Sequence, residues 1–289
     1  MNKIILIGDS QVGDGYPCFF IAEIGINHNG SLDQAKKLID VAVECGCDAV
    51  KFQKRTVDMV YTPEELARPR ENPFGTTNGD LKRGLEFGEE EFSEIDRYCK
   101  EKKIQWTASC WDEDSVDFIE RFNPPCYKIA SASLTDDNLL KHHRKYGKPI
   151  ILSTGMSTME QIEHAVEVLG VDDLIILHST STYPAQPEEL NLKMIRTLKE
   201  KFPGPIGYSG HEVGLASTFA ATVLGANVLE RHITLDRSMW GSDHAASVEP
   251  QGLQRLVRDI REWEIAQGNG VKKIYEGEIP IIKKLRRKG

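Results

Sequence analysis

The feature that most constrains the fold of this chain is a regular alternation of short apolar segments with amphipathic helical segments. The apolar segments are too uniformly apolar for half-exposed antiparallel strands and suit strands that are covered on both faces. There are eight of them: FFIAEIG (19–25), AVKFQ (49–53), IQWTAS (104–109), CYKIA (126–130), PIILST (149–154), LIILHST (174–180), PIGYSG (205–210) and VLERHIT (228–234). Eight strand–helix units in one unbroken series favour an α/β fold of the closed (β/α)8 TIM barrel type over a doubly wound sheet.

The helical segments carry start and stop signals as well as apolar residues three and four positions apart. Ser31 and Thr158 are suited to cap the N-termini of two helices, and Gly46 and Gly170 are suited to end them. The best defined predicted helices are 32–45, 158–169 and, as the eighth, 250–268.

Two segments fall outside the eight units. Residues 1–18 contain a predicted short N-terminal hairpin, over 3–18, across the closed end of the barrel. Residues 54–88, rich in Pro, Gly, Asn and Thr, are too long for a simple connection and are predicted to form a lid-like or binding loop. A barrel commonly occupies about 250 residues as one domain, so we expect residues 1–289 to form a single catalytic domain without a second one.

Composition narrows the class of protein. The formal net charge is −8, and the one basic run is the C-terminal KKLRRKG, so a nucleic-acid partner is not expected. No apolar run could span a bilayer, and the N-terminus lacks the pattern of a signal peptide, which predicts a cytoplasmic protein with no membrane association. The six cysteines show no zinc-like spacing and are expected to be reduced, small apolar residues.

In a barrel, function lies at the carboxyl ends of the strands. Reading off those ends gives a dense ring of polar residues: Glu23, Asn27, His28, Lys51, Gln53, Ser109, Lys128, Ser131, Ser153, His178, Ser179, Ser181, Tyr183, Ser209, His211, Glu230, His232 and Asp243.

Several of these residue types indicate a chemistry. Lys51 and Lys128 lie inside strands, where a buried lysine is costly unless an anion neutralises it. With the strand-end serines they could hold a phosphate and a carboxylate, although an ion pair with a glutamate of a neighbouring strand is the alternative for each lysine. His211 and His232 end adjacent strands and could bind one metal ion, but their spacing alone is weak evidence.

Two glutamates and three further histidines are the remaining residues with an expected role or location. Glu23 and Glu230 are candidates for an acid, a base or an outer partner of the metal site. The helical residues His142, His143 and His164 are expected to be solvated surface residues.

Six motifs, taken together, resemble the catalytic barrel of the N-acetylneuraminate (sialic acid) synthases and the related legionaminic, pseudaminic and other nonulosonate synthases. The resemblance runs from about residue 18 to residue 280, in the same order. The motifs are AEIGINHNGSLDQAKKLI (22–39), DAVKFQ (48–53), YKIASAS (127–133), KPIILSTGMSTMEQI (148–162), IGYSGHEVG (206–214) and LERHITLDRSMWGSDHAAS (229–247).

The resemblance implies a transferase that condenses phosphoenolpyruvate with a sugar aldehyde, giving a 2-keto-3-deoxy sugar acid and phosphate. It implies a divalent cofactor, Mn²⁺ first and Mg²⁺ or Co²⁺ as alternatives, bound by His211 and His232. Glu23 is implied to position or activate water and the reaction intermediate. Phosphoenolpyruvate is implied to contact Lys51, Ser109, Lys128, Ser131, Ser153 and Ser209, and the sugar to contact Gln53, Tyr183 and Asp243.

The chain departs from the family pattern in two respects. Typical members continue into a small antifreeze-like domain that covers the active site of a dimer partner, whereas this chain stops at KKLRRKG. We therefore expect that closure to be absent or supplied by another polypeptide, and a homodimer remains an open alternative. In addition, Ser181 and Ser133 stand where members that use acetylmannosamine have asparagine and glutamate, which predicts an altered acceptor such as a mannose-like or phosphorylated hexose, or another 2-acylamino sugar.

Two competing functions remain open at this point. One is another phosphoenolpyruvate–aldose synthase that makes a seven- or eight-carbon keto-deoxy acid. The other is a non-catalytic barrel that binds a sialic-acid-like ligand, although such a protein would have no need of a complete set of metal and phosphate ligands.

Overall fold

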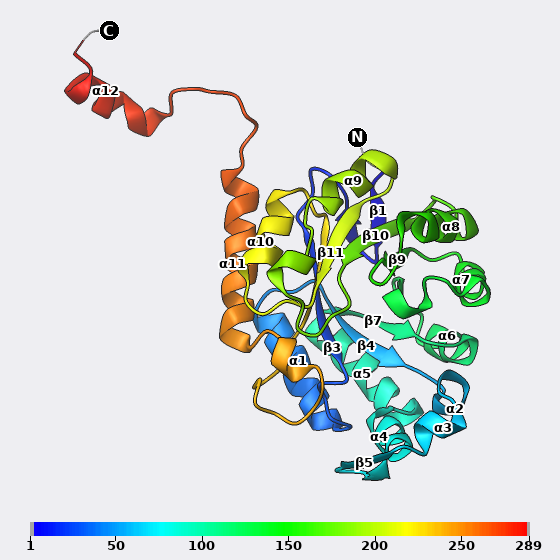
Figure 1. Cartoon of the computed structure of the whole chain (residues 1–289). Coiled ribbons are helices and arrows are strands. Elements are labelled where there is room, and N and C mark those ends of the chain that lie inside the picture. Colours follow the sequence, from blue (N-terminus) through cyan, green and yellow to red (C-terminus); the bar gives the residue numbers. More distant parts are fainter. Residues whose placement is uncertain (1–2, 288–289) are drawn as a thin grey trace.

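The computed structural model describes residues 3–287 and contains a closed barrel of eight parallel strands (Figure 1). The strands follow one another around the barrel in the order β10-β11-β12-β3-β4-β7-β8-β9, which confirms the predicted TIM barrel. Each strand lies within two residues of its predicted bounds. The strands are β3 (Phe19–Gly25), β4 (Ala49–Lys54), β7 (Gln105–Cys110), β8 (Tyr127–Ile129), β9 (Ile150–Ser153), β10 (Leu174–Ser179), β11 (Ile206–Gly210) and β12 (Val228–His232).

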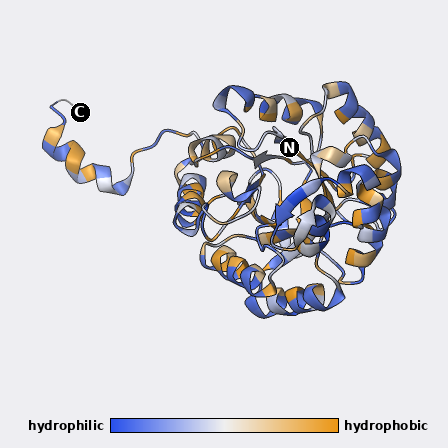
Figure 2. Cartoon of the chain, turned by 60° about the horizontal axis from the view of Figure 1, so that its bottom comes forward, coloured by the Kyte–Doolittle hydropathy of each residue, from blue (hydrophilic) through white to orange (hydrophobic). Residues whose placement is uncertain are grey.

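Helices surround the strands as a ring (Figure 2). They are α1 (Leu32–Glu44), α5 (Glu89–Lys102), α6 (Glu113–Glu120), α7 (Asp137–Arg144), α8 (Met159–Leu169), α9 (Met194–Lys201), α10 (Ala216–Val223) and α11 (Pro250–Ala266). The predicted caps are confirmed, because the Ser31 and Thr158 side chains accept hydrogen bonds from the backbone of the first turns of α1 and α8. The apolar sides of these helices pack on the strands and form the main core.

The predicted N-terminal hairpin is present and closes one end of the barrel. β1 (Ile5–Ile7) and β2 (Ser10–Val12) pair antiparallel. Ile5, Ile7 and Val12 belong to a second buried cluster that includes Phe19 and Val228, the first residues of β3 and β12. The hairpin therefore covers the amino ends of the strands and leaves the carboxyl ends as the open face.

Residues 54–88 differ from the predicted loop, because most of the segment has regular structure. It contains α2 (Val57–Val60), α3 (Pro63–Leu66), an antiparallel pair of β5 (Pro69–Asn72) with β6 (Gly75–Thr77), and α4 (Asn78–Leu85). A capping box between Thr77 and Asp80 begins α4. The Pro, Gly, Asn and Thr residues of this segment thus serve as turn and cap residues of short elements.

The prediction for one helical histidine was wrong. His143 is fully buried, because it lies four residues after Leu139 on the inner face of α7, and its ring packs edge-on against Tyr127. His164 is exposed, as predicted. All six cysteines are unpaired.

The chain leaves the barrel after α11. A short helix, α12 (Ile279–Leu285), lies away from the ring of helices (Figures 1 and 2). The final two residues of the basic run KKLRRKG lie outside the described residues. Among the helices of residues 3–287, none has the length and apolar character that a membrane span requires.

Candidate active site

Side chains from all eight barrel strands, or from the loops that follow them, meet in a cavity of about 200 Å³ at the carboxyl ends of the strands. Strand alternation explains this, because residues two apart in a strand point to the same side. Lys51 and Gln53 of β4, and Glu230 and His232 of β12, are such pairs. The cavity is lined by Glu23, Lys51, Gln53, Ser109, Trp111, Lys128, Ala130, Ser131, Ala132, Ser153, Met156, Ser181, Tyr183, Ser209, His211, Glu230 and His232.

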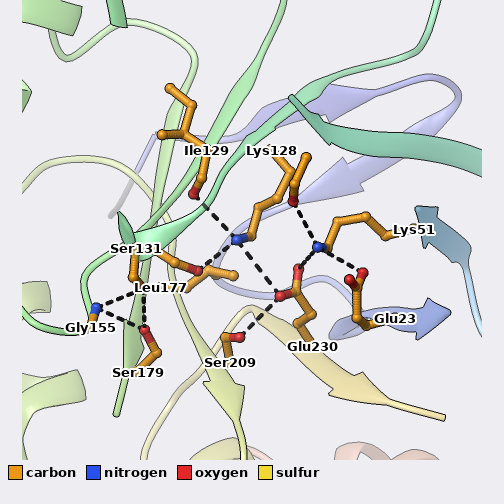
Figure 3. Close-up of polar contacts among 12 residues, drawn as sticks. Glu23, Lys51, Lys128, Ile129, Ser131, Gly155, Leu177, Ser179, Ser209 and Glu230 are labelled. Carbon is orange, nitrogen blue, oxygen red and sulfur yellow. Dashed lines mark hydrogen bonds and ion pairs between the residues drawn. The ribbon is translucent and has the colours of Figure 1, made fainter. Parts of the chain in front are cut away.

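Lys51 is one of two buried cations in this cavity. Its Nζ lies 2.7 Å from Glu23 Oε2 and 3.8 Å from Glu230 Oε2, and it donates a hydrogen bond to Ser109 Oγ at 2.8 Å (Figure 3). Lys51 therefore makes the ion pair that was the alternative to anion binding, and it also faces the cavity.

Lys128 is the second buried cation. Its Nζ donates to Ser153 Oγ at 2.7 Å and lies 3.7 Å from Glu230 Oε1, which also accepts a hydrogen bond from Ser209 Oγ at 3.0 Å (Figure 3). Glu230 thus lies between the two lysines. With Glu23 it balances their charge, so the buried group is neutral overall when all four are ionised.

The two carboxyl groups have different proton affinities. Burial, reinforced by Glu230 and opposed by Lys51, raises the pKa of Glu23 to about 7. Burial acts in the same direction on Glu230, but Lys128 and Lys51 outweigh it and lower the pKa of Glu230 to about 2. Burial lowers the pKa of Lys128 to about 8. Two acids whose pKa values are pushed apart are suited to different roles, and Glu23 is the one that can exchange a proton near neutral pH.

A second polar cluster lies at the loop after β9. The backbone N–H of Gly155 donates to Ser131 Oγ and to Ser179 Oγ, each at 2.9 Å (Figure 3). A Cβ at position 155 would lie 2.1 Å from Ser181 Oγ, so a larger residue would require that hydroxyl to move. Ser181 Oγ is buried and has no hydrogen-bond partner within the described residues, which leaves it free to bind a ligand.

The two strand-end histidines face each other, with ring centroids 5.8 Å apart. His211 Nδ1 lies 2.6 Å from the carbonyl oxygen of Thr180, which can only accept, so Nδ1 carries the hydrogen. His211 Nε2 is then an acceptor, 3.0 Å from the hydroxyl of Tyr183. His232 Nδ1 is buried and has no hydrogen-bond partner among the described residues.

Both rings are suited to bind a cation. Burial, reinforced by the other histidine, lowers the pKa of His211 to about 4, and burial also lowers the pKa of His232. Neutral imidazoles with one nitrogen fixed by a backbone carbonyl are typical metal ligands. Within residues 3–287, no group of three or more His, Cys, Asp or Glu side chains is arranged to hold a metal. Two histidines would therefore leave coordination positions open for water and substrate.

The structure brings together most of the predicted site residues. Six of them do not line the cavity: Asn27, His28, Ser133, His178, Ser179 and Asp243. Ser133 is buried at the end of the 3-10 turn Ser131–Ser133. Asp243 lies in the loop after β12, accepts a hydrogen bond from Ser242 Oγ, and is close enough to reinforce the effect of burial in raising the pKa of Tyr183.

Four lining residues were missed by the sequence analysis: Trp111, Ala130, Ala132 and Met156. Trp111 directly follows β7, and Met156 lies three residues after β9, so the strand-end rule extended to three residues beyond each strand would have included them. The two alanines carry no polar signal in the sequence.

Comparisons with known proteins identify the family of this chain. The sequence model of the NeuB family matches residues 38–272. The chain is 44% identical over 280 residues to the N-acetylneuraminate-9-phosphate synthase of Homo sapiens, covering 95% of this chain and 78% of that protein. It is 36% identical over 285 residues to the N,N'-diacetyllegionaminic acid synthase of Legionella pneumophila, covering 95% and 80%. The crystal structure of an N-acetylneuraminic acid (sialic acid) synthetase from Leptospira borgpetersenii has a TM-score of 0.86 at 30% identity and covers 100% of this chain and 99% of that one.

Proposed function

Because the chain belongs to the NeuB family, we propose that it condenses phosphoenolpyruvate with a sugar aldehyde to give a sialic-acid-like 2-keto-3-deoxy sugar acid and inorganic phosphate. Its relatives are synthases, so the chain is a carbon–carbon bond-forming enzyme rather than a binding module.

The observation that carries this proposal is the pair of buried lysines with their serine partners. Phosphoenolpyruvate has a phosphate and a carboxylate close together, and two ammonium groups with several hydroxyl donors match these two anions. Lys51 with Ser109, and Lys128 with Ser153, supply such groups at the bottom of the cavity, where burial strengthens the attraction. These residues orient the substrate and balance its charge, and form no covalent bond to it.

The reaction forms one carbon–carbon bond and one new carbon–oxygen bond at C2, and it breaks the C2–O bond to phosphate. C3 of phosphoenolpyruvate bonds to the aldehyde carbon, water adds its oxygen to C2, and the resulting adduct loses phosphate to leave the C2 ketone. A divalent metal, when bound, supplies Lewis-acid polarisation of the aldehyde oxygen. Glu23 is the group proposed to take the proton from the attacking water, since burial raises its pKa to about 7. Glu230, which stays ionised, holds the two lysines in place.

His211 and His232 are proposed to hold the divalent cation, with Mn²⁺ as the first choice and Mg²⁺ or Co²⁺ as alternatives. The support is their neutrality, the carbonyl that fixes the tautomer of His211, and the unpartnered Nδ1 of His232.

The acceptor is proposed to differ from N-acetylmannosamine. The reasons are the serine at position 181, whose hydroxyl is buried and free, and the absence of a longer side chain at position 133. Gln53 and Tyr183, the latter half-exposed at the mouth, are placed to contact the sugar, with Asp243 beside them.

A panel of aldoses incubated with phosphoenolpyruvate and Mn²⁺ tests the proposal. The panel contains N-acetylmannosamine, mannose and their 6-phosphates, further 2-acylamino sugars, and tetrose and pentose phosphates, with phosphate release and product mass as readouts. We expect aldose-dependent phosphate release and a product three carbons longer than a hexose. Phosphate release at the same rate with and without an aldose would refute the reaction. Products from the tetrose and pentose phosphates would instead indicate a seven- or eight-carbon keto acid. Turnover of N-acetylmannosamine well above every other sugar would contradict the altered acceptor.

A further inference from the structure

Arg55 is a buried guanidinium that neither the strand-end analysis nor the proposed mechanism uses. It directly follows β4 and is 5% exposed. A buried arginine is costly unless its charge is compensated. Here two of its nitrogens are hydrogen-bonded and the third, Nε, lies near a carboxylate without a hydrogen bond. Nη2 donates to Gln53 Oε1, Nη1 donates to the Tyr61 hydroxyl at 3.2 Å, and Nε lies 3.2 Å from Glu86 Oε1.

The arginine determines which way the amide of Gln53 points. A guanidinium has only donors, so the atom of Gln53 that faces it must be the carbonyl oxygen. The amide nitrogen is then directed to the other side, where it donates to Glu23 Oε1 at 3.2 Å. Arg55 thereby fixes the orientation of a residue that lines the cavity beside Glu23.

Arg55 itself belongs to the segment 54–88, and its guanidinium also joins the two ends of that segment at the mouth of the barrel. Tyr61 and Glu86 lie near the two ends of that segment, and Glu86 accepts a further hydrogen bond from the backbone N–H of Arg55 at 3.1 Å. The flat face of the guanidinium lies 4.8 Å from the ring centroid of Trp111, another cavity residue. One side chain therefore joins β4, the loop after β7 and the segment 54–88.

We propose that Arg55 is a positioning residue for the acceptor sugar. It holds the Gln53 amide with its N–H groups toward Glu23 and the cavity, and it fixes the segment 54–88 beside that amide. The inference rests on the proposed condensation for its kinetic part, but its structural part stands on the contacts of Arg55 alone.

Two variants test this role. Arg55→Met removes every polar contact of the side chain. Arg55→Lys keeps a positive charge beside Glu86 but cannot hold Gln53 and Tyr61 together, because an ammonium lacks the rigid fork of donors. A matched control is Arg261→Met. Arg261 is a paired, half-buried guanidinium that contacts Asp48 and the carbonyl of Cys18, at the amino ends of the strands and away from the cavity. If Arg55→Met does not fold, the same measurements on Glu86→Gln test the contact between Glu86 and the guanidinium, which stays in place.

The readouts separate a positioning role from a general loss of stability. For Arg55→Met we expect KM for the acceptor to rise about tenfold or more, which is the effect of losing one charge-assisted hydrogen bond. The Kd of phosphoenolpyruvate should stay within about threefold, and backbone hydrogen exchange over residues 56–86 should become faster. Arg55→Lys should fall between Arg55→Met and the wild type, and Arg261→Met should lower thermal stability without changing either constant.

The result that overturns the inference is an acceptor KM and an exchange rate for Arg55→Met that match those of Arg261→Met. Equal weakening of sugar and phosphoenolpyruvate binding would also overturn it, because that pattern indicates general disruption. If the wild type condenses no aldose, the proposed function fails, while the exchange measurement still decides whether Arg55 holds the segment.

Discussion

Replacing Lys51 with methionine tests the charge balance of the buried network, because the cost of this substitution should depend on pH. Lys51 Nζ lies 2.7 Å from Glu23 and 3.8 Å from Glu230. At an effective dielectric constant of about 20, unit charges at these separations interact by roughly 6 and 4 kcal/mol before the cost of burying them. The contact with Glu23 is the larger, and it exists only while Glu23 is ionised.

The sign of the effect follows from the proton affinity of Glu23. Burial, with Glu230 adding to it and Lys51 opposing it, raises the pKa of Glu23 from 4.5 to about 7. The contribution of Glu23 to wild-type stability should therefore fall between about pH 4.5 and 7, where the folded state binds the extra proton, and then level off. Without Lys51 the pKa of Glu23 rises further, so the fall continues above pH 7 at about 1.4 kcal/mol per pH unit. By pH 9, Lys51→Met should be destabilised by about 3 kcal/mol more than at pH 7.

The assay is urea unfolding followed by tryptophan fluorescence at pH 7, 8 and 9, with a chelator present so that no metal contributes. The set comprises wild type, Lys51→Met, Glu23→Gln, the double variant and, as a control, Lys100→Met, which removes an exposed lysine paired with Asp96. The control should show little change, since exposed pairs contribute little. Lys128, whose pKa burial lowers to about 8, also titrates in this range, and the Glu23→Gln background separates its contribution. The reasoning would be refuted if Lys51→Met lowered the free energy of unfolding equally at pH 7 and 9. It would also be refuted if that effect rose as steeply with pH in the Glu23→Gln background.

Three further predictions follow from the site and the core. His232→Ala should lower bound Mn²⁺, measured by elemental analysis after dialysis, by at least about tenfold and reduce activity with it; retained metal and activity would count against the proposed ligand pair. Gly155→Ala places a Cβ 2.1 Å from Ser181 Oγ, so it should cost about 1–3 kcal/mol in urea unfolding and impair turnover, and Ser181→Ala in the same chain should recover part of the stability. Burial lowers the pKa of His143 to about 4, so the contribution of His143 to stability, opposite in sign to that of Glu23, should fall by about 2–3 kcal/mol as pH drops from 6.5 toward 4.5. The variant His143→Leu should lack that fall, and an unchanged slope in its urea midpoints would contradict the assignment.

Barrel strands are the part of this molecule that sequence periodicity defines best. FFIAEIG coincides with β3, because a strand buried on both faces requires a mostly apolar segment, and six of its seven residues are apolar or glycine. The closed-end hairpin and the caps at Ser31 and Thr158 were predictable for similar reasons, since each depends on residues that are neighbours in sequence.

What could not be predicted depends on contacts between distant segments. The burial of His143 requires knowing which face of α7 packs on the barrel, and a histidine at that position has no distinctive local signal. Arg55 was overlooked because its partners at positions 61, 86 and 111 come together only when the barrel closes. Ser133 was placed at the sugar by its motif, yet the turn that presents Ser131 to the cavity leaves Ser133 behind it.

The hairpin at the amino ends of the strands determines where ligands can enter and leave the barrel. Because Ile5, Ile7 and Val12 close that end, substrates and products must enter and leave at the carboxyl ends of the strands. The lysines proposed to bind the phosphate are buried, whereas Tyr183, proposed to contact the sugar, is half-exposed. Phosphoenolpyruvate should therefore enter before the sugar, and the finished acid should depart before the phosphate behind it. The sugar would thus bind last, and the acid that contains it would leave first.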